Sequence, residues 1–305
     1  MKKILLIAFL LPLFVSAQEY VDLLKVNYSE TLKNNFQDMD KSTTVKIFNA
    51  GLIFPIVLNE NQALITGADF NSNNLQLFPE AQFTNLYSTN LKLGLASTWS
   101  EKYSTTVVLL PKIASDYKNI SDDDFYLGVF ALLNMKKNEN LKYRFAVYVA
   151  KEAFGVYATP IVGWYYLSPN QRFEMDMSLP IAADINYKLG KTNVGIDYYG
   201  IGKTFKIHNE NTPTLYVDHS SLEFSGYFQY NLLEESVLLR AKAGYSTNKF
   251  EVYNEDDKID FRLSAFSLGD DRTQLNTSIN GSIFFRIEAV YRFHIRETNS
   301  ETPNP

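Results

Sequence analysis

From about residue 20 onward, apolar and polar residues alternate one by one along most of the chain. The clearest examples cover residues 91–96, 141–150, 172–179, 222–230 and 283–293. In each of them one set of alternate positions is apolar, and the other set holds charged, polar or small residues. Successive side chains of a strand point to opposite faces, so the pattern predicts strands with one apolar and one polar face. No segment repeats its apolar residues at helical spacing.

The polar connections between these segments alternate between short and long. The short ones are residues 59–61, 100–102, 168–171, 190–192 and 233–235, and the long ones are 71–86, 114–123, 203–219 and 248–257. Outer-membrane barrels have short periplasmic turns and longer outer loops. The sequence therefore predicts an all-β fold, a closed antiparallel up-and-down transmembrane β-barrel of about 14 strands (roughly 12 to 16) with both termini on the periplasmic side. The count of 16 takes Asn280-Gly281 as a tight hairpin turn and divides the chain near Leu179-Pro180.

The first residues have the pattern of a secretory signal peptide. Lys2 and Lys3 precede the apolar stretch Ile4–Val15, and small or compact residues follow up to Ala17. The stretch is too short for a transmembrane helix, which needs about 20 residues. Gln18 follows the expected cleavage site, so a lipid-modified cysteine is not expected there. The predicted organisation is a signal peptide over 1–17, a barrel over 18–296 and a polar C-terminal tail over 297–305.

Composition narrows the function classes further. The chain has 305 residues, of which 46% are hydrophobic, and its net charge is −5. The acidic balance argues against nucleic-acid binding, and the absence of cysteine excludes disulfides and cysteine-based zinc sites. The 20 Tyr, 22 Phe and 2 Trp suit the aromatic belts of a membrane barrel, although a soluble sandwich core is the alternative. The expected partners are outer-membrane lipid, lipopolysaccharide and the barrel insertion machinery; no cofactor is expected, and the ligand stays unidentified.

One stretch of the chain resembles a known group of barrels. Leu179-Pro180, Asp184, Tyr187-Lys188-Leu189 and Val194-Gly195 are similar to a segment of an uncharacterised outer-membrane β-barrel family of the Bacteroidetes type. The resemblance implies location and architecture only, since that family has no established activity to carry over. The chain departs from the usual barrel ending, because further residues follow Tyr291-Arg292-Phe293 where an aromatic residue would normally end the chain.

The best functional candidates are charged residues that the alternation places on the inner face of the barrel. They are Lys142, Arg144, Arg172, Glu174, Asp176, Glu223, Arg240, Lys242, Arg286, Glu288 and Arg292. Seven are basic and four acidic, which predicts a preference for anions if the lumen is open. Such a set either lines a water-filled passage or pairs across the lumen and closes it. The leading hypothesis is a porin-like passage for small solutes, and the alternative is a structural or binding barrel without a channel.

An enzymatic function has only weak support in the sequence. His219 and Ser221 would share one face of a strand, and an outer-membrane phospholipase resembles this spacing. The Asn-Gly that follows the serine there is missing, because Leu222 and Glu223 occupy those positions. A hydrolase using Ser221 and His219 is therefore only a remote alternative, and we expect no enzyme activity.

No metal site is expected from the sequence. His208, His219 and His294 are too scattered to form a recognisable cluster. The acidic runs Ser121–Asp124 and Glu255–Asp257 have the ligand types of a Ca²⁺ site or of a bridge to lipopolysaccharide, but acidic runs of this kind are more often solvated loops.

Overall fold

A computed structural model of the protein describes residues 20–208 and 214–294. The predicted signal peptide and the predicted polar tail lie outside the described residues. Within the described ranges, no helix is long and apolar enough to cross a membrane.

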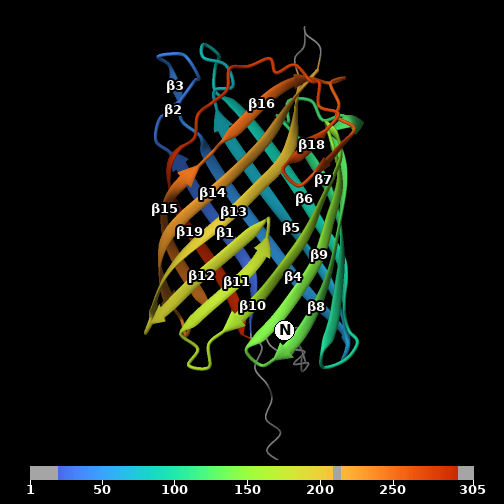
Figure 1. The fold of residues 1–305 in the computed structure, drawn as a ribbon, viewed down its shortest axis with the longest axis vertical. Coiled ribbons are helices and arrows are strands. Elements are labelled where there is room, and N and C mark those ends of the chain that lie inside the picture. Colours follow the sequence, from blue (N-terminus) through green and yellow to red (C-terminus); the bar gives the residue numbers. More distant parts are fainter. Residues whose placement is uncertain (1–19, 209–213, 295–305) are drawn as a thin grey trace, which may run out of the picture.

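Fourteen strands form one closed antiparallel barrel (Figure 1). Each pairs with the next along the chain, and the last pairs with the first, with Ile287 opposite Tyr28. This confirms the predicted barrel and the expected strand number. The strands are β1 (Tyr20–Thr31), β4 (Lys46–Asn59), β5 (Gln62–Leu75), β6 (Thr84–Thr98), β7 (Tyr103–Ser115), β8 (Phe125–Asn138), β9 (Leu141–Glu152), β10 (Gly155–Leu167), β11 (Phe173–Leu179), β12 (Ala182–Leu189), β13 (Thr192–Ile207), β14 (Leu215–Leu232), β15 (Val237–Ser246) and β19 (Ser282–His294).

The remaining elements belong to the connections. They are the strands β2 (Asn34–Asn35), β3 (Ser42–Thr43), β16 (Lys249–Asn254), β17 (Phe261–Leu263) and β18 (Phe266–Leu268), and the single 3-10 turn η1 (Asp122–Asp124). All of them lie at one end of the barrel, which we call the long-loop end. The first residue of β1 and the short turns lie at the opposite, short-turn end (Figure 1), except for the two-residue turns between β9 and β10 and between β11 and β12, which face the long-loop end.

Alternation places apolar side chains on the outside of the wall. On β9, Phe145, Val147 and Val149 are exposed on the outer face, whereas Arg144 lines the lumen. Ile287 on β19 is 72% exposed. Because side chains alternate between the two faces of a strand, the barrel has an apolar outer face and a polar inner one.

Two predicted loops are shorter than expected, because the strands continue into them. β5 extends to Leu75, β13 extends to Ile207 and β14 begins at Leu215. These strand ends are rich in polar residues such as Asn71 and His219, which resemble loop composition. They pair nevertheless, because the inner face of a barrel accepts polar side chains.

The prediction of a hairpin turn at Asn280-Gly281 is wrong. β15 pairs directly with β19, with Ser246 opposite Ser282, so residues 247–281 form one long connection, in which β16 continues the wall along β14 before the chain leaves it. The segment carries β16, β17 and β18, and we call it the mouth segment. The count of 16 strands fails for this reason.

The barrel wall is shorter at strands β11 and β12 than elsewhere. β11 and β12 have 7 and 8 residues, and their hairpin ends well below the upper rim (Figure 1). Above it, β17 pairs in parallel with the free edge of β10, with Arg262 opposite Tyr157. On the other side of the gap, β13 reaches β7, where Lys206 lies opposite Ser115. The unpaired edges that a short hairpin would leave are thus covered at both points.

A hydrophobic core fills the long-loop end of the barrel. It includes the fully buried side chains of Phe154, Phe205, Val217 and Val252, which come from the β9–β10 turn, β13, β14 and β16. Ile259 of the mouth segment packs into the same core. The barrel is therefore closed at its long-loop end.

Candidate functional site

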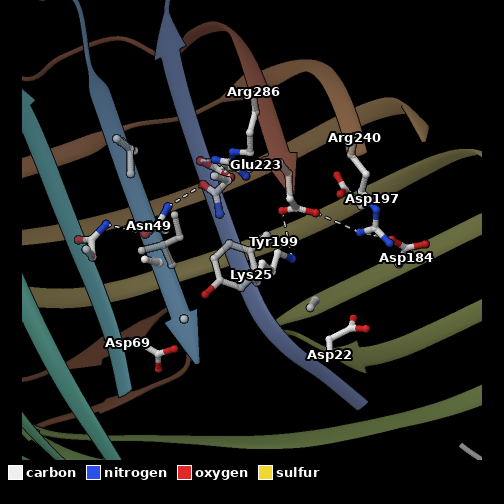
Figure 2. Close-up of a pocket in the computed structure, with 18 of the residues that line it drawn as sticks. Asp22, Lys25, Asn49, Asp69, Asp184, Asp197, Tyr199, Glu223, Arg240 and Arg286 are labelled. Atoms are coloured by element: carbon white, nitrogen blue, oxygen red, sulfur yellow. Dashed lines mark hydrogen bonds and ion pairs between the residues drawn. The ribbon is translucent and has the colours of Figure 1, made fainter. Parts of the chain in front are cut away.

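A cavity of about 780 Å³ occupies the lumen below this core. Its wall runs from Tyr20 and Arg292, near the short-turn end, to Lys203 and His219, next to the core. Nine of the eleven charged candidates line it: Arg144, Glu174, Asp176, Glu223, Arg240, Lys242, Arg286, Glu288 and Arg292. Figure 2 shows part of this wall, with Arg286 beside Glu223 and Arg240 beside Asp184.

The other two candidates do not line the cavity. Arg172 lies in the turn before β11 and is exposed, because the strand begins one residue later. Lys142 lies near the short-turn end of β9, opposite Tyr165, and is half-buried.

Seven further charged residues also line the cavity. The sequence analysis did not select them as candidates. They are Asp22, Lys25, Asp69, Lys92, Asp184, Asp197 and Lys203. With them the wall carries eight basic and eight acidic side chains. The predicted basic excess is therefore replaced by a balance, and the predicted preference for anions loses its basis.

A bulge in β1 explains why alternation did not identify Asp22 and Lys25 as lumen residues. The register of β1 shifts between Asp22 and Leu24, so Asp22 and Lys25 both line the lumen although they are three residues apart. A bulge adds one residue to one strand and reverses the alternation beyond it. The other five residues lie on strands with regular pairing, and strict extension of the period-two pattern would have found them.

Glu288 is the centre of the charge network. Its carboxylate is 3.2 Å from Lys25 Nζ, 3.1 Å from Arg240 Nη1 and 3.6 Å from Lys242 Nζ, and its side chain is 2% exposed. Lys242 also contacts Asp197. One acidic group thus binds three cations from β1 and β15, which fixes these strands around β19.

Most of the other wall charges also form pairs. Arg286 donates to both oxygens of Glu223 at 3.0 and 2.8 Å. The remaining pairs are Arg144 with Asp176, Arg292 with Asp22, and Lys92 with Asp69. Pairing of this kind keeps charge inside the barrel at a tolerable cost.

Asparagine side chains form a hydrogen-bonded row on the adjacent part of the wall. Asn73 donates to Asn71, Asn71 to Asn49 and Asn49 to Asn27, at 2.7, 2.7 and 2.9 Å. The row crosses β5, β4 and β1. It gives the cavity a neutral polar surface beside the charged one.

The histidine and serine of the hydrolase alternative are not joined. Ser221 Oγ lies 2.8 Å from Ser246 Oγ and accepts a hydrogen bond from the Asn248 amide at 3.0 Å. The His219 ring stacks on Phe250 at 3.8 Å, and neither ring nitrogen has a hydrogen-bond partner in the described part of the chain. The geometry does not support a nucleophile activated by this histidine.

Asp218 on β14 fixes the mouth segment. It accepts hydrogen bonds from Arg262 at 3.0 and 2.6 Å and from Arg272 at 3.1 Å. Arg262 also lies over the Phe154 ring, 3.9 Å from its centroid. Arg272 also forms an ion pair with Asp270. Its hydrogen bonds hold the pKa of Asp270 below the ordinary value, so the Arg272–Asp270 pair stays charged in mildly acidic solution.

Part of each acidic run contacts a basic side chain of the same protein. Lys206 contacts Asp123 at 3.6 Å and also contacts Glu255, while His208 lies 3.4 Å from Asp124. Among the described residues, no group of three or more His, Asp or Glu side chains is arranged to hold a metal ion.

Residues 13–287 match a family described as a domain of unknown function, DUF6268. The match covers most of the chain and all the barrel strands except the last residues of β19. The chain belongs to the DUF6268 family. No curated protein matches the sequence. The family description assigns no activity, so the chemistry of the site has to be argued from its residues.

Solved structures of outer-membrane proteins are loosely similar. The COG4313 outer membrane channel from Pseudomonas putida F1 aligns at 8% identity and a TM-score of 0.45, covering 92% of this chain and 97% of that one. OprB from Pseudomonas putida aligns at 10% identity and a TM-score of 0.36, covering 90% and 94%. The NanC porin aligns at 10% identity and 0.36, covering 88% and 98%. The barrel assignment here rests on its own strand pairing.

Proposed function

We propose that this protein is an outer-membrane channel for small polar solutes, closed at its extracellular end in the conformation described here. The observation that carries the proposal is the polar cavity of about 780 Å³ inside a closed barrel. Sites for small molecules commonly measure about 300–1,000 Å³. A barrel with only a structural role has no need for a hollow of this size.

The outer face supports a place in the membrane. Soluble monomers rarely expose apolar patches above a few hundred Å², yet exposed Leu, Val, Ile and Phe recur along the outward positions of this barrel. Near the short-turn end, Trp99, Tyr103, Tyr187, Tyr230 and Tyr291 are all exposed. Aromatic residues gather where lipid headgroups begin, so this ring fits a membrane boundary.

The finer parts of the proposal concern export and surroundings. The short-turn end would face the periplasm, after removal of residues 1–17 and insertion by the barrel insertion machinery. Outer-membrane lipid and lipopolysaccharide would contact the apolar face. The kinship with barrels of the Bacteroidetes type stays a prediction. The balanced wall leads us to expect little preference between small anions and cations.

Planar-bilayer recordings test the passage. We expect the intact protein to conduct rarely, because the hydrophobic core and the mouth segment close one end. A variant in which a short Gly-Ser linker replaces residues 256–278 removes β17, β18 and the arginines that bind Asp218, and it should open much more often. If neither protein conducts while both are folded and inserted, the channel proposal fails.

Because the cavity is closed at one end, a second candidate function is that of a barrel that binds a solute without transporting it. The lumen is closed by the apolar core beside His219, which suits retention as well as passage. Solute binding without conductance in either protein would favour this alternative.

A further inference from the structure

One basic side chain on the cavity wall has no acidic partner. Seven of the eight basic residues contact a carboxylate within ion-pair distance, and Lys203 on β13 is the exception among the described residues. Glu174 is the acidic counterpart without a cation, but it accepts hydrogen bonds from Tyr20, Tyr165 and Asn186 at 2.8, 2.9 and 3.1 Å. Glu174 therefore has hydrogen-bond partners, whereas Lys203 lacks a carboxylate of its own.

The charged groups around Lys203 are committed elsewhere. Its acidic neighbours are Glu152, Asp69 and Glu223. Glu152 binds Lys112 at 2.6 Å, Asp69 binds Lys92 at 2.7 Å and Glu223 binds Arg286 at 2.8 Å. The ammonium group of Lys203 lies over the Phe205 ring, 5.9 Å from its centroid, and has no ion-pair partner among the described residues.

Two more polar groups of the cavity wall lack hydrogen-bond partners. His219 lies directly opposite Lys203 on β14, lines the same cavity and is 1% exposed, and both its ring nitrogens are unpaired. Asn73 also lines the cavity and is fully buried, and its Oδ1 has no donor. Buried polar atoms are nearly always hydrogen-bonded, so a concentration of unpaired ones in a cavity points to a missing ligand.

We propose that the inner end of the cavity binds a hydroxylated monocarboxylate. The ligand carboxylate would pair with Lys203 and accept a hydrogen bond from the His219 N–H, and a ligand hydroxyl would donate to Asn73 Oδ1. One negative charge is preferred, because Lys203 is the one cation of the cavity wall without an acidic partner among the described residues. The proposal concerns binding and does not depend on passage through the barrel.

Binding of D-gluconate to the purified full chain in detergent, measured by calorimetry, tests this. D-sorbitol, which has the hydroxyls but no carboxylate, and the dianion D-glucarate are the comparators. We expect gluconate to bind more tightly than either. Lys203→Gln should weaken gluconate binding by about tenfold or more, as expected for the loss of a charge-assisted hydrogen bond.

Lys25→Gln is the matched control, because it lowers the charge of the same wall by one, leaves Glu288 paired with Arg240 and Lys242, and leaves Lys203 and its acidic neighbours in place. It should change gluconate affinity far less than Lys203→Gln. His219→Phe, which keeps an aromatic ring on Phe250, should weaken binding by roughly threefold to tenfold. Equal effects of the two lysine variants, or gluconate binding no tighter than sorbitol, would overturn the proposal. Neither result would bear on conductance.

Discussion

Replacing Glu288 by Gln is expected to lower the free energy of unfolding by about 3–5 kcal/mol, because it leaves buried cations without their shared counter-charge. Lys25, Arg240 and Lys242 all lie within 3.6 Å of this carboxylate. Lys242 retains Asp197, and Arg240 retains Asp184 at 3.9 Å, but Lys25 has no other ion pair in the described part of the chain. The measurement is urea-induced unfolding of the protein in lipid vesicles.

Glu30→Gln provides the control for this change. Glu30 lies on β1 and pairs with Lys46 at 3.7 Å, but both side chains are nearly half exposed. Exposed pairs contribute about 0–1 kcal/mol, so this variant should unfold close to the parent. Similar losses in the two variants would mean that the Glu288 network is solvated and not a structural centre.

Replacing Asp218 by Asn is expected to release the mouth segment from β14. Arg272 has only 2% of its side chain exposed, and Arg262 has 11%. Loss of their shared carboxylate should cost about 3 kcal/mol in this region, which corresponds to roughly a hundredfold faster hydrogen exchange through local opening. Hydrogen–deuterium exchange over residues 255–278 measures this, and strands β4 to β6 should keep their protection.

Asp271→Asn is the matched control, because Asp271 is an exposed aspartate of the same segment. Its exchange should stay within a few-fold of the parent. If Asp218→Asn leaves exchange over 255–278 unchanged, the segment is held by apolar packing, and Asp218 is not its anchor.

The strand pattern was readable from the sequence because alternation is a local property. The apolar faces of residues 141–150 and 283–293 follow directly from it, and the structure has them outward. The bulge between Asp22 and Leu24 was not readable, and it brought Lys25 into the lumen. A bulge depends on pairing with a strand more than 250 residues away, so nothing near Asp22 announces it.

The closure of the long-loop end by a hydrophobic core was equally impossible to predict from the sequence. Phe205, Val217 and Val252 fit ordinary strand alternation, but the structure turns them into one core at the long-loop end. Their meeting depends on the short β11–β12 hairpin, which lets β13 reach β7. Alternation shows which face a residue takes, whereas the filling of a lumen depends on contacts across the barrel. The sequence alone therefore does not determine whether the candidate charges pair with one another or line a passage.

Cysteine accessibility tests the central claim, a water-filled lumen open at the short-turn end and closed at the other. The chain has no cysteine, so single substitutions report cleanly. Three variants in lipid vesicles receive a membrane-impermeant maleimide from outside: Asn170→Cys in an exposed short turn, Lys118→Cys in an outer loop, and Ser178→Cys on the cavity wall. The labelled fraction of Ser178→Cys should equal that of Asn170→Cys. Labelling of all molecules, or a fraction equal to that of Lys118→Cys, or no labelling at all, would contradict the account.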